Sequence, residues 1–213
     1  MLLRRMPDWL SPETRRGMEA VTAQLVAQFA GTFSRETVEG LVGDTLARWP
    51  VMPSQHFLPV VIYRFARDRL RAMGQTEGAI TKERPRVLFV SSRDGARSQM
   101  AAGLLSRAAE ERVDVCSAGV TPALEVDPAI VAVLAEVGID LRAAFPKPLT
   151  DEILHAADRV VTIGGADPHP ALATARAADW DVPDLARRSL DELREIRDHL
   201  DRRASDLLDS LGL

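Results

Sequence analysis

The pattern of apolar positions along the 213-residue chain changes near residue 85. Before this point, apolar residues recur every three or four positions in three stretches. After it, short continuous apolar runs alternate with helical stretches. Helical spacing is typical of amphipathic helices, whereas a short apolar run between turn residues is typical of a strand buried on both faces. The sequence therefore predicts a helical N-terminal part followed by an α/β part.

We expect residues 1–75 to form a small three-helix bundle. Ser11 and Ser34 are hydroxyl residues at the starts of the first two helical stretches, and the third stretch ends near Gly74. Pro59 lies either in the first turn of the third helix or at a kink within it. Short connections favour antiparallel neighbours. The apolar stripes form the bundle core or, alternatively, a surface through which two copies form a homodimer.

Residues 76–85 are polar and are expected to be a linker, and residues 86–213 are expected to form the second domain. Strands alternate with helices there, which is typical of an open parallel four-stranded sheet flanked by helices and wound right-handedly. In such sheets ligands bind beyond the carboxyl ends of the strands, so the loop at 91–98 is the candidate site. The expected strands are 86–90, 113–118, 158–163 and 177–180, and the expected helices are 97–109, 128–137, one beginning at 150, and 189–211.

Composition narrows the possible partners. Hydrophobic residues make up 46% of the chain and charged residues 27%, which is typical of a globular protein. The formal net charge of -4 provides no field for polyphosphate, so we expect neither nucleic acid nor an anionic membrane as a partner. No stretch reaches the roughly 18 apolar residues of a membrane span, and the N-terminus does not read as a signal peptide. We expect a cytoplasmic protein.

Metal and cofactor chemistry is not expected from the sequence. The single cysteine, Cys116, cannot form an intramolecular disulfide or a multi-cysteine zinc site, and is read as a small apolar residue of a strand. The four histidines show no close pairing of the kind that binds metals. We therefore expect no metal and no cofactor.

The loop after the first strand carries a specific pattern. The run Val87-Leu-Phe-Val90 is followed, after six residues, by Arg97-Ser-Gln-Met-Ala101. This resembles the phosphate loop of the low-molecular-weight protein tyrosine phosphatases and of the arsenate reductases that share their fold. The leading helices resemble the three-helix extension of actinobacterial-type members. Further similar segments follow in the same order over residues 86–210, at 117–119, 136–140, 147–150, 160–163 and 179–184.

The resemblance implies roles for individual residues. In the family, a cysteine at the start of the loop attacks phosphorus or arsenic, an arginine six residues later binds the oxyanion, and an aspartate protonates the leaving oxygen. Ser91, Arg97 and Asp184 occupy these positions and are the candidate catalytic residues. Backbone N–H groups at a helix start favour an anion, and a guanidinium group matches its oxygens. The expected oxyanion-binding residues are Ser91, Ser92, Arg93, Asp94, Gly95, Ala96, Arg97 and Ser98.

Serine at position 91 departs from the family pattern. A hydroxyl loses its proton far less readily than a thiol and needs an adjacent base, and the loop contains no histidine or lysine. Oxygen also cannot pass electrons through a disulfide. We therefore expect that arsenate reduction and phosphomonoester hydrolysis by the family route are absent. The chain reads as a catalytically degenerate member that at most binds phosphate- or arsenate-like oxyanions.

Two neighbouring positions also differ from relatives. Asp94 replaces an asparagine, and a carboxylate at ~4 Å from an anion would repel it by about 4 kcal/mol at an effective dielectric of ~20. An inward-turned Arg93 would offset this repulsion. Ala96 replaces a glycine and would restrict the loop if the position needs a positive φ. The resemblance places the relay cysteines of arsenate reductases at the segment 164–170, which here reads Gly-Gly-Ala-Asp-Pro-His-Pro, with Asp167 and His169 near the expected mouth of the pocket.

The residues leave alternative readings open. Ser91 and Ser98 are helix or strand caps as readily as ligand contacts, Arg97 could pair with a local acid, and Asp184 could cap a loop. A second hypothesis is an enzyme with a rebuilt pocket that uses Ser91, Asp94 or Asp184 in a different reaction. A third is an interaction module that pairs with an active relative.

Overall fold

The computed structural model describes residues 6–49, 55–165 and 177–213. The chain divides into two compact units, Met1–Thr81 and Lys82–Leu213. The boundary between them falls inside the segment 76–85 that the sequence indicates as a linker. Each unit is described by itself.

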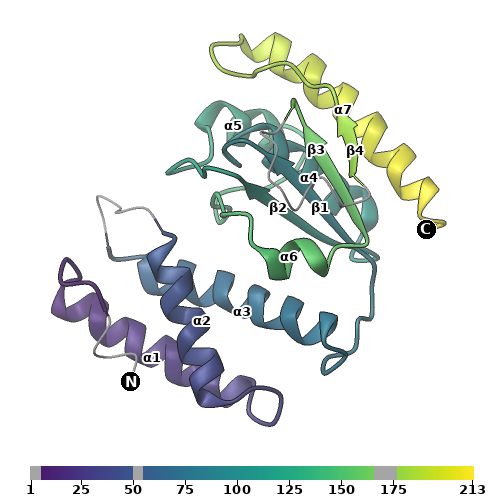
Figure 1. Ribbon diagram of the computed structural model, residues 1–213. Coiled ribbons are helices and arrows are strands. Elements are labelled where there is room, and N and C mark those ends of the chain that lie inside the picture. The colour runs from purple at the N-terminus through teal and green to yellow at the C-terminus, as the bar shows by residue number, and fades with distance from the viewer. Residues whose placement is uncertain (1–5, 50–54, 166–176) are drawn as a thin grey trace. The chain divides into compact units, whose positions relative to one another are not determined.

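The first unit contains three helices, α1 (Pro12–Gln28), α2 (Arg35–Ala47) and α3 (Leu58–Thr76) (Figure 1). The hydroxyls of Ser11 and Ser34 accept the N–H groups three residues later, so both serines cap their helices as expected. Pro59 lies in the first turn of α3, where its missing N–H is tolerated. The helices bury their apolar faces, which include Met18, Leu25, Val38, Val42, Ile62, Phe65 and Leu70.

The second unit contains a four-stranded, all-parallel sheet in the order β2-β1-β3-β4, which confirms the predicted fold class. Strand β1 is central, because β2 pairs with one of its edges and β3 with the other (Figure 1). Parallel strands end at the same side of a sheet, so Ser91 and Gly119 lie opposite each other at the carboxyl ends of β1 and β2. The strands are β1 (Arg86–Ser91), β2 (Asp114–Gly119), β3 (Arg159–Ile163) and β4 (Ala177–Trp180).

The helices of the second unit begin close to the expected positions. The last helix, expected over 189–211, begins with a capping box, in which the side chains of Ser189 and Glu192 each accept the backbone N–H of the other residue. The second helix ends at Ala135 rather than 137, because the chain turns there and Gly138 adopts a φ of 80°. The helices are α4 (Arg97–Ala109), α5 (Pro128–Ala135), α6 (Asp151–His155) and α7 (Leu190–Ser210).

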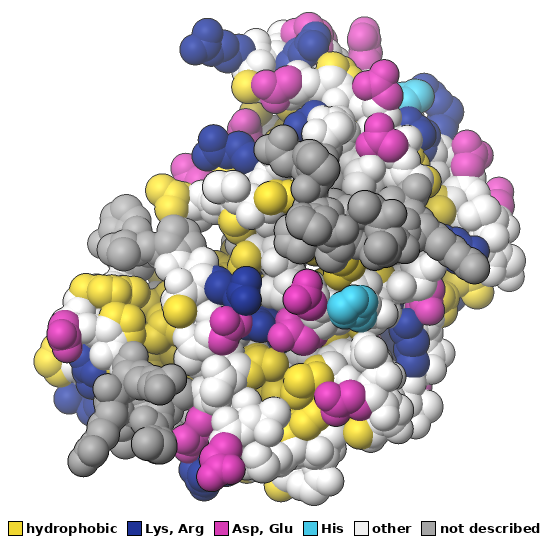
Figure 2. Space-filling view, in the orientation of Figure 1, with side chains coloured by type: hydrophobic (Ala, Val, Ile, Leu, Met, Phe, Trp, Pro, Cys, Tyr) yellow, Lys and Arg dark blue, Asp and Glu magenta, His cyan; other side chains and the backbone are white. Residues whose placement is uncertain are grey.

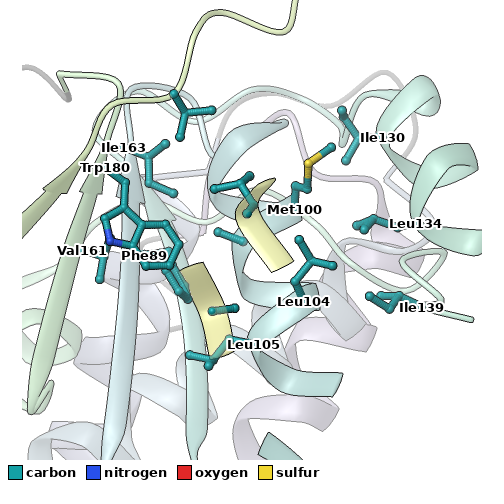
Figure 3. Close-up of a cluster of buried hydrophobic side chains, with 14 of the residues drawn as sticks. Phe89, Met100, Leu104, Leu105, Ile130, Leu134, Ile139, Val161, Ile163 and Trp180 are labelled. Carbon is teal, nitrogen blue, oxygen red and sulfur yellow. The ribbon is translucent and has the colours of Figure 1, made fainter. Parts of the chain in front are cut away.

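One apolar core holds α4, α5 and α7 against the sheet (Figure 3). Alternate residues of β1, Val87 and Phe89, point into this core and are fully buried. The rings of Phe89 and Trp180 pack 5.4 Å apart, which links the central strand to β4. Met100, Leu104 and Leu105 of α4 and Ile130 and Leu134 of α5 also belong to the cluster, and Leu193 and Leu200 join it from α7. Because α4 is anchored along its length, its first turn is held firmly at the end of β1.

The surface carries charges of both signs. On the face drawn in Figure 2, acidic and basic side chains are interspersed outside the grey residues. Within the described ranges, no helix is both long enough and apolar enough to cross a membrane.

Candidate functional site

The loop 92–96 joins the carboxyl end of the central strand to the first turn of α4. Ser91 is the last residue of β1, and Arg97 is the first residue of the helix. Gly119, at the end of β2, lies directly against this loop. A Cβ atom at Gly119 would approach the backbone carbon of Arg93 and the nitrogen of Asp94 to 2.8 Å. Glycine is therefore required at 119 for the loop to pass so close to β2.

The carbonyl groups of the loop are turned away from its centre. Backbone N–H groups of the segment 120–127 donate to the carbonyl oxygens of Ser91, Ser92, Arg93 and Gly95 at 2.7–3.2 Å. The carbonyl of Ala96 accepts from Met100 at 2.8 Å inside α4. A peptide whose carbonyl is fixed on one side presents its N–H on the other. These hydrogen bonds thus orient the loop as an anion-binding nest.

Several loop N–H groups have no acceptor within the part of the chain that the structure describes. They belong to Ser92, Arg93, Gly95 and Ala96. The first N–H groups of α4 add the positive end of a helix dipole to the same place. Unsatisfied donors that converge at a helix start favour a tetrahedral anion.

Asp94 lies under the loop rather than in it. Its φ of 48° is left-handed, which aspartate tolerates better than most residues, and its side chain is fully buried. Its carboxylate accepts the backbone N–H of Lys147 at 2.8 Å and the amide of Gln99 at 3.1 Å. Ala96 has a φ of -144°, so the loop needs no glycine there. The positive-φ position is Asp94, and the expected restriction at Ala96 does not arise.

The environment of Asp94 shifts its acidity. Burial is the largest influence and raises the pKa of the carboxyl above its ordinary 3.8, against the charge of Lys147 and the hydrogen bonds that the carboxylate accepts. The ammonium group of Lys147 lies 3.7 Å from Oδ2. The hydroxyl of Ser98, the amide of Gln99 and the backbone N–H of Lys147 all donate to the carboxylate, and these contacts favour its ionised form, against the effect of burial.

Three polar groups form a chain at the floor of the loop. The hydroxyl of Ser98 donates to Asp94 Oδ1 at 2.8 Å, and the oxygens of Ser91 and Ser98 are 2.8 Å apart. The N–H of Asp94 donates to Ser91 Oγ at 3.1 Å. Because the proton of Ser98 is directed to the carboxylate, the proton of Ser91 is directed to Ser98. Neither serine caps a helix through its hydroxyl.

Arg97 is positioned by neutral groups. Its Nη1 donates to the carbonyl oxygen of Val182 at 3.1 Å and to that of Gly164 at 3.4 Å. Among the described residues no carboxylate forms an ion pair with it. A Cβ atom at Gly164 would lie 1.7 Å from Nη1, so this glycine leaves the room that the guanidinium occupies. The pairing of Arg97 with a local acid is therefore not what the structure shows.

A cleft of about 740 Å³ opens above the loop. Of the residues expected at the site, Asp94 and Ser98 lie beneath its floor, and Ser91, Ser92, Arg93, Gly95, Ala96, Arg97 and Asp184 line it. Asp184 is exposed, and its Oδ1 accepts the N–H of Ala186 at 3.2 Å, so it also caps the turn that follows. The structure thus brings the three candidate catalytic residues to one cleft.

The structure adds residues that the sequence reasoning did not place at the site. Lys147 and Gln99 hold Asp94, and Gly164 makes room for Arg97. Glu125 and Asp127 add negative charge to the wall of the cleft. The sequence gives no local signal for these contacts, since Lys147 lies 53 residues beyond Asp94.

The described residues contain neither a metal-binding cluster nor a thiol at the cleft. The described ranges hold no group of three histidine, cysteine or acidic side chains that could bind a metal ion. Asp167 and His169, which the sequence places near the mouth, lie outside the described residues. Cys116 is half-buried in β2 and does not line the cleft.

Known proteins match both units. Residues 86–212 match the low molecular weight phosphotyrosine protein phosphatase family, and residues 18–74 match the protein-tyrosine-phosphatase-like N-terminal domain. A putative arsenate reductase of Halobacterium salinarum is 31% identical over 129 residues, which are 58% of this chain and 91% of that protein.

Two solved structures extend the comparison. The thioredoxin-dependent arsenate reductase Cg_ArsC1' of Corynebacterium glutamicum is 33% identical with a TM-score of 0.77, over 92% of this chain and 96% of that one. A cysteine-to-serine mutant of the YwlE arginine phosphatase with a phosphorylated active site serine is 28% identical with a TM-score of 0.53, over 60% of this chain and 95% of that one. With the parallel sheet and the loop at its carboxyl end, these matches show that the chain belongs to the low molecular weight phosphotyrosine protein phosphatase family.

Proposed function

We propose that the second unit binds phosphate- or arsenate-like oxyanions in the loop 91–98 and does not carry out the thiol chemistry of its relatives. The observation that carries the proposal is the combination of two features of the described residues: convergent N–H groups of the loop find no acceptor there, and the partners of Arg97 there are neutral carbonyl groups. Both groups face one cleft. Charge-assisted hydrogen bonds from such donors are the strong contacts of oxyanion sites.

The position of Asp94 favours binding. A carboxylate turned toward the anion would oppose it by several kcal/mol, but this carboxylate lies below the floor of the cleft and next to the ammonium of Lys147. Three other acids, Glu125, Asp127 and Asp184, line the cleft and weaken its attraction for anions. We therefore expect modest rather than tight affinity.

The serine at position 91 supports the proposal that the loop binds an oxyanion without the thiol-based reaction of its relatives. Ser91 lies at the floor of the cleft, and the only cysteine of the chain is elsewhere. Without sulfur at the floor, no disulfide can form there to carry electrons to arsenate. The arginine phosphatase mutant with a phosphorylated serine supports the view that a serine in this fold lies within reach of phosphorus.

Isothermal titration with phosphate and with arsenate tests the proposal. Arg97→Ala is expected to lower the affinity at least ~10-fold, because it removes a charged hydrogen-bond donor. Arg142→Ala is the matched control, since Arg142 is exposed and pairs with Asp140 away from the cleft. Equal affinity of wild type and Arg97→Ala would refute oxyanion binding in the loop.

A second measurement addresses the missing chemistry. Wild-type protein incubated with arsenate and a thiol reductant is expected to produce no arsenite, and para-nitrophenyl phosphate is expected to undergo no multiple turnover above the Arg97→Ala level. Arsenite accumulation, or sustained release of para-nitrophenol by wild type alone, would contradict the absence of the family reaction.

Exposed apolar residues support a homodimer or another protein contact as an additional role. Phe57 and Val60, at the start of α3, are 66% and 54% exposed. Apolar side chains that are exposed side by side mark a contact surface where they belong to a contiguous apolar patch. Light scattering is expected to show a dimer that Phe57→Ser together with Val60→Ser converts to a monomer. A wild-type monomer would remove this proposal, and stoichiometric co-purification with an active relative would replace it.

A further inference from the structure

The polar chain beneath the cleft has a direction. Asp94 accepts the backbone N–H of Lys147 and the amide of Gln99 on one oxygen and the hydroxyl of Ser98 on the other. The amide nitrogen of Gln99 also donates to the carbonyl of Phe145 at 3.2 Å, which fixes the orientation of that amide. The carboxylate therefore accepts hydrogen bonds on both of its oxygens and is the final acceptor of the hydrogen-bonded chain that runs from Ser91 through Ser98.

The same direction of hydrogen-bond donation holds for Ser91, at the floor of the cleft. With the proton of Ser98 committed to Asp94, the free lone pairs of Ser98 Oγ accept the proton of Ser91, 2.8 Å away. Ser91 Oγ also accepts the N–H of Asp94 at 3.1 Å, so its remaining lone pair is the one available to the cleft. A serine becomes a nucleophile when an adjacent base can take its proton in this way.

We propose that Ser91 is a phosphoryl acceptor activated by Asp94 through the hydroxyl of Ser98. The donor is a phosphate ester with a good leaving group, such as an aryl phosphate. Ser91 Oγ forms a bond to phosphorus, the bond from phosphorus to the aryl oxygen breaks, and the aryl oxygen leaves with the electron pair as an aryloxide. The proton of Ser91 moves to Ser98 while the proton of Ser98 moves to Asp94. This inference rests on the proposed function, because the phosphoryl group is the oxyanion that the loop binds.

Charge balance favours the step. Before transfer, the buried carboxylate and the bound phosphate are both negative. After transfer, Asp94 is neutral while the phosphoryl group stays on Ser91, so the repulsion between them is removed. The raised pKa of Asp94 agrees with this role, because burial makes the carboxylate a better proton acceptor than an exposed one.

The ester is expected to persist. Water must attack phosphorus in line with the departing Ser91 oxygen, and therefore from the cleft side. Asp94 and Ser98 lie on the opposite side, below the floor. The relay that forms the ester is thus in the wrong place to hydrolyse it. The expected outcome is one phosphoryl group per chain, with a single burst of aryloxide.

The Asp94→Asn variant tests whether Asp94 accepts the proton of Ser91 through Ser98, which we call the proton relay, or only supports the loop. An asparagine in the same place keeps an oxygen toward Lys147 and Gln99 and turns its amide nitrogen toward Ser98. The hydroxyl of Ser98 then donates to Ser91, so every hydrogen bond is retained but the chain runs in reverse. The variant is expected to fold and to bind phosphate at least as tightly as wild type, because a buried negative charge has been removed. What it lacks is a proton acceptor.

The experiment follows phosphorylation of Ser91 by mass spectrometry during incubation with para-nitrophenyl phosphate, with Ser91→Ala identifying the site. Asp94→Asn and Ser98→Ala are expected to be slower at least ~100-fold, the usual share of a general base. Thr162→Val is the control, since it removes a surface hydroxyl that donates to Asp179 at 2.7 Å. The wild-type rate of phosphorylation is expected to rise with pH as Asp94 ionises, at a higher pH than an ordinary carboxyl group because its pKa is raised. The rate of Asp94→Asn is expected to show no such rise with pH.

Phosphate titration of the same samples distinguishes the two proposals. If wild type binds phosphate but Ser91 remains unmodified, the relay is wrong and the oxyanion site stands. If Asp94→Asn is phosphorylated as fast as wild type with the same pH profile, Asp94 is a structural residue and the relay is wrong. If wild type does not bind phosphate at all, the proposed function fails and this inference fails with it.

Discussion

An arginine lies at each end of strand β1, buried at the amino end and half-buried at the carboxyl end, and the two have different hydrogen-bond partners. At the amino end, the Nε and Nη2 of Arg86 donate to Asp114 at 2.8 and 2.5 Å, and the backbone N–H of Arg86 donates to Asp158 at 2.7 Å. At the carboxyl end, the acceptors that Arg97 finds within the described ranges are the carbonyl groups of Gly164 and Val182. The first guanidinium is neutralised within the fold, and the second keeps its charge toward a cleft.

Because their partners differ, Arg86 is expected to affect mainly the stability of the fold, and Arg97 mainly the affinity for an anion. A guanidinium that is paired with an acid contributes to the stability of the fold, because removal of one partner leaves the charge of the other without a counter-charge. A guanidinium held by neutral dipoles is oriented without being neutralised, so an incoming anion gains most of its attraction. The amino end of the strand is therefore expected to control stability, and the carboxyl end to control ligand affinity.

The largest expected effect comes from Gly164→Ala. A Cβ atom there would lie 1.7 Å from Arg97 Nη1 and 2.9 Å from the carbonyl oxygen of Val182, and the residue has a φ of 65°. The guanidinium must move, so phosphate affinity is expected to fall ~10- to 100-fold, together with ~1 kcal/mol of backbone strain. Calorimetric titration with phosphate measures the change.

Gly165→Ala is the matched control for this substitution. Its φ of 60° carries a similar strain, but no heavy atom of the described residues lies within 4 Å of a Cβ placed there. Stability is expected to fall by ~1 kcal/mol with phosphate affinity unchanged. If both variants lost affinity equally, the displacement of Arg97 would not be the cause.

Arg86→Met removes the ion pair with Asp114 at the amino end of β1. Arg86 is 3% exposed, whereas Asp114 is 40% exposed and can be hydrated once its partner is gone. We expect a loss of about 2 kcal/mol in the free energy of unfolding, below the 3–5 typical of a fully buried pair. Urea unfolding measures this loss, and phosphate titration is expected to give the wild-type affinity. A large fall in affinity would show that the two ends are not separate.

Asp94→Asn tests how the carboxylate under the loop contributes to stability. Because the pKa of Asp94 is raised on folding, the folded state binds more protons than the unfolded state between the ordinary value of 3.8 and the higher folded value. The contribution of Asp94 to stability therefore falls as pH rises through this window and is constant above it. Urea unfolding at several pH values is expected to show this fall in wild type relative to Asp94→Asn. A constant difference between the two proteins would contradict the raised pKa.

The smallest expected effect is that of Glu125→Gln. This acid is exposed at the wall of the cleft, so its removal is expected to raise phosphate affinity by less than ~1 kcal/mol, or about fivefold. The gain should shrink at high salt, because exposed charges are screened. Glu195→Gln, on the exposed face of α7, removes the same charge away from the cleft and is expected to leave the affinity unchanged.

Sequence reasoning located the elements well and the details of the site less well. The strand expected at 113–118 is β2 at Asp114–Gly119, and the last helix, expected over 189–211, is α7 at Leu190–Ser210, because periodicity is a local signal. The direction of Asp94 was left open. It depends on the backbone N–H of Lys147, which a sequence pattern cannot place beside the loop. The concern about Ala96 was conditional on a positive φ, and Asp94 adopts that φ instead.

The order of residues by itself determined the fold class, the loop that carries the candidate site, and an oxygen at position 91 where the resemblance places sulfur. Each of these follows from the type of residue at a position and from its spacing to near neighbours. Only the tertiary structure decided that the carboxylate of Asp94 lies beneath Ser91, and that Arg97 meets carbonyl groups rather than acids. These contacts join residues 53 to 85 positions apart, and packing of the whole sheet and its helices brings them within hydrogen-bond distance.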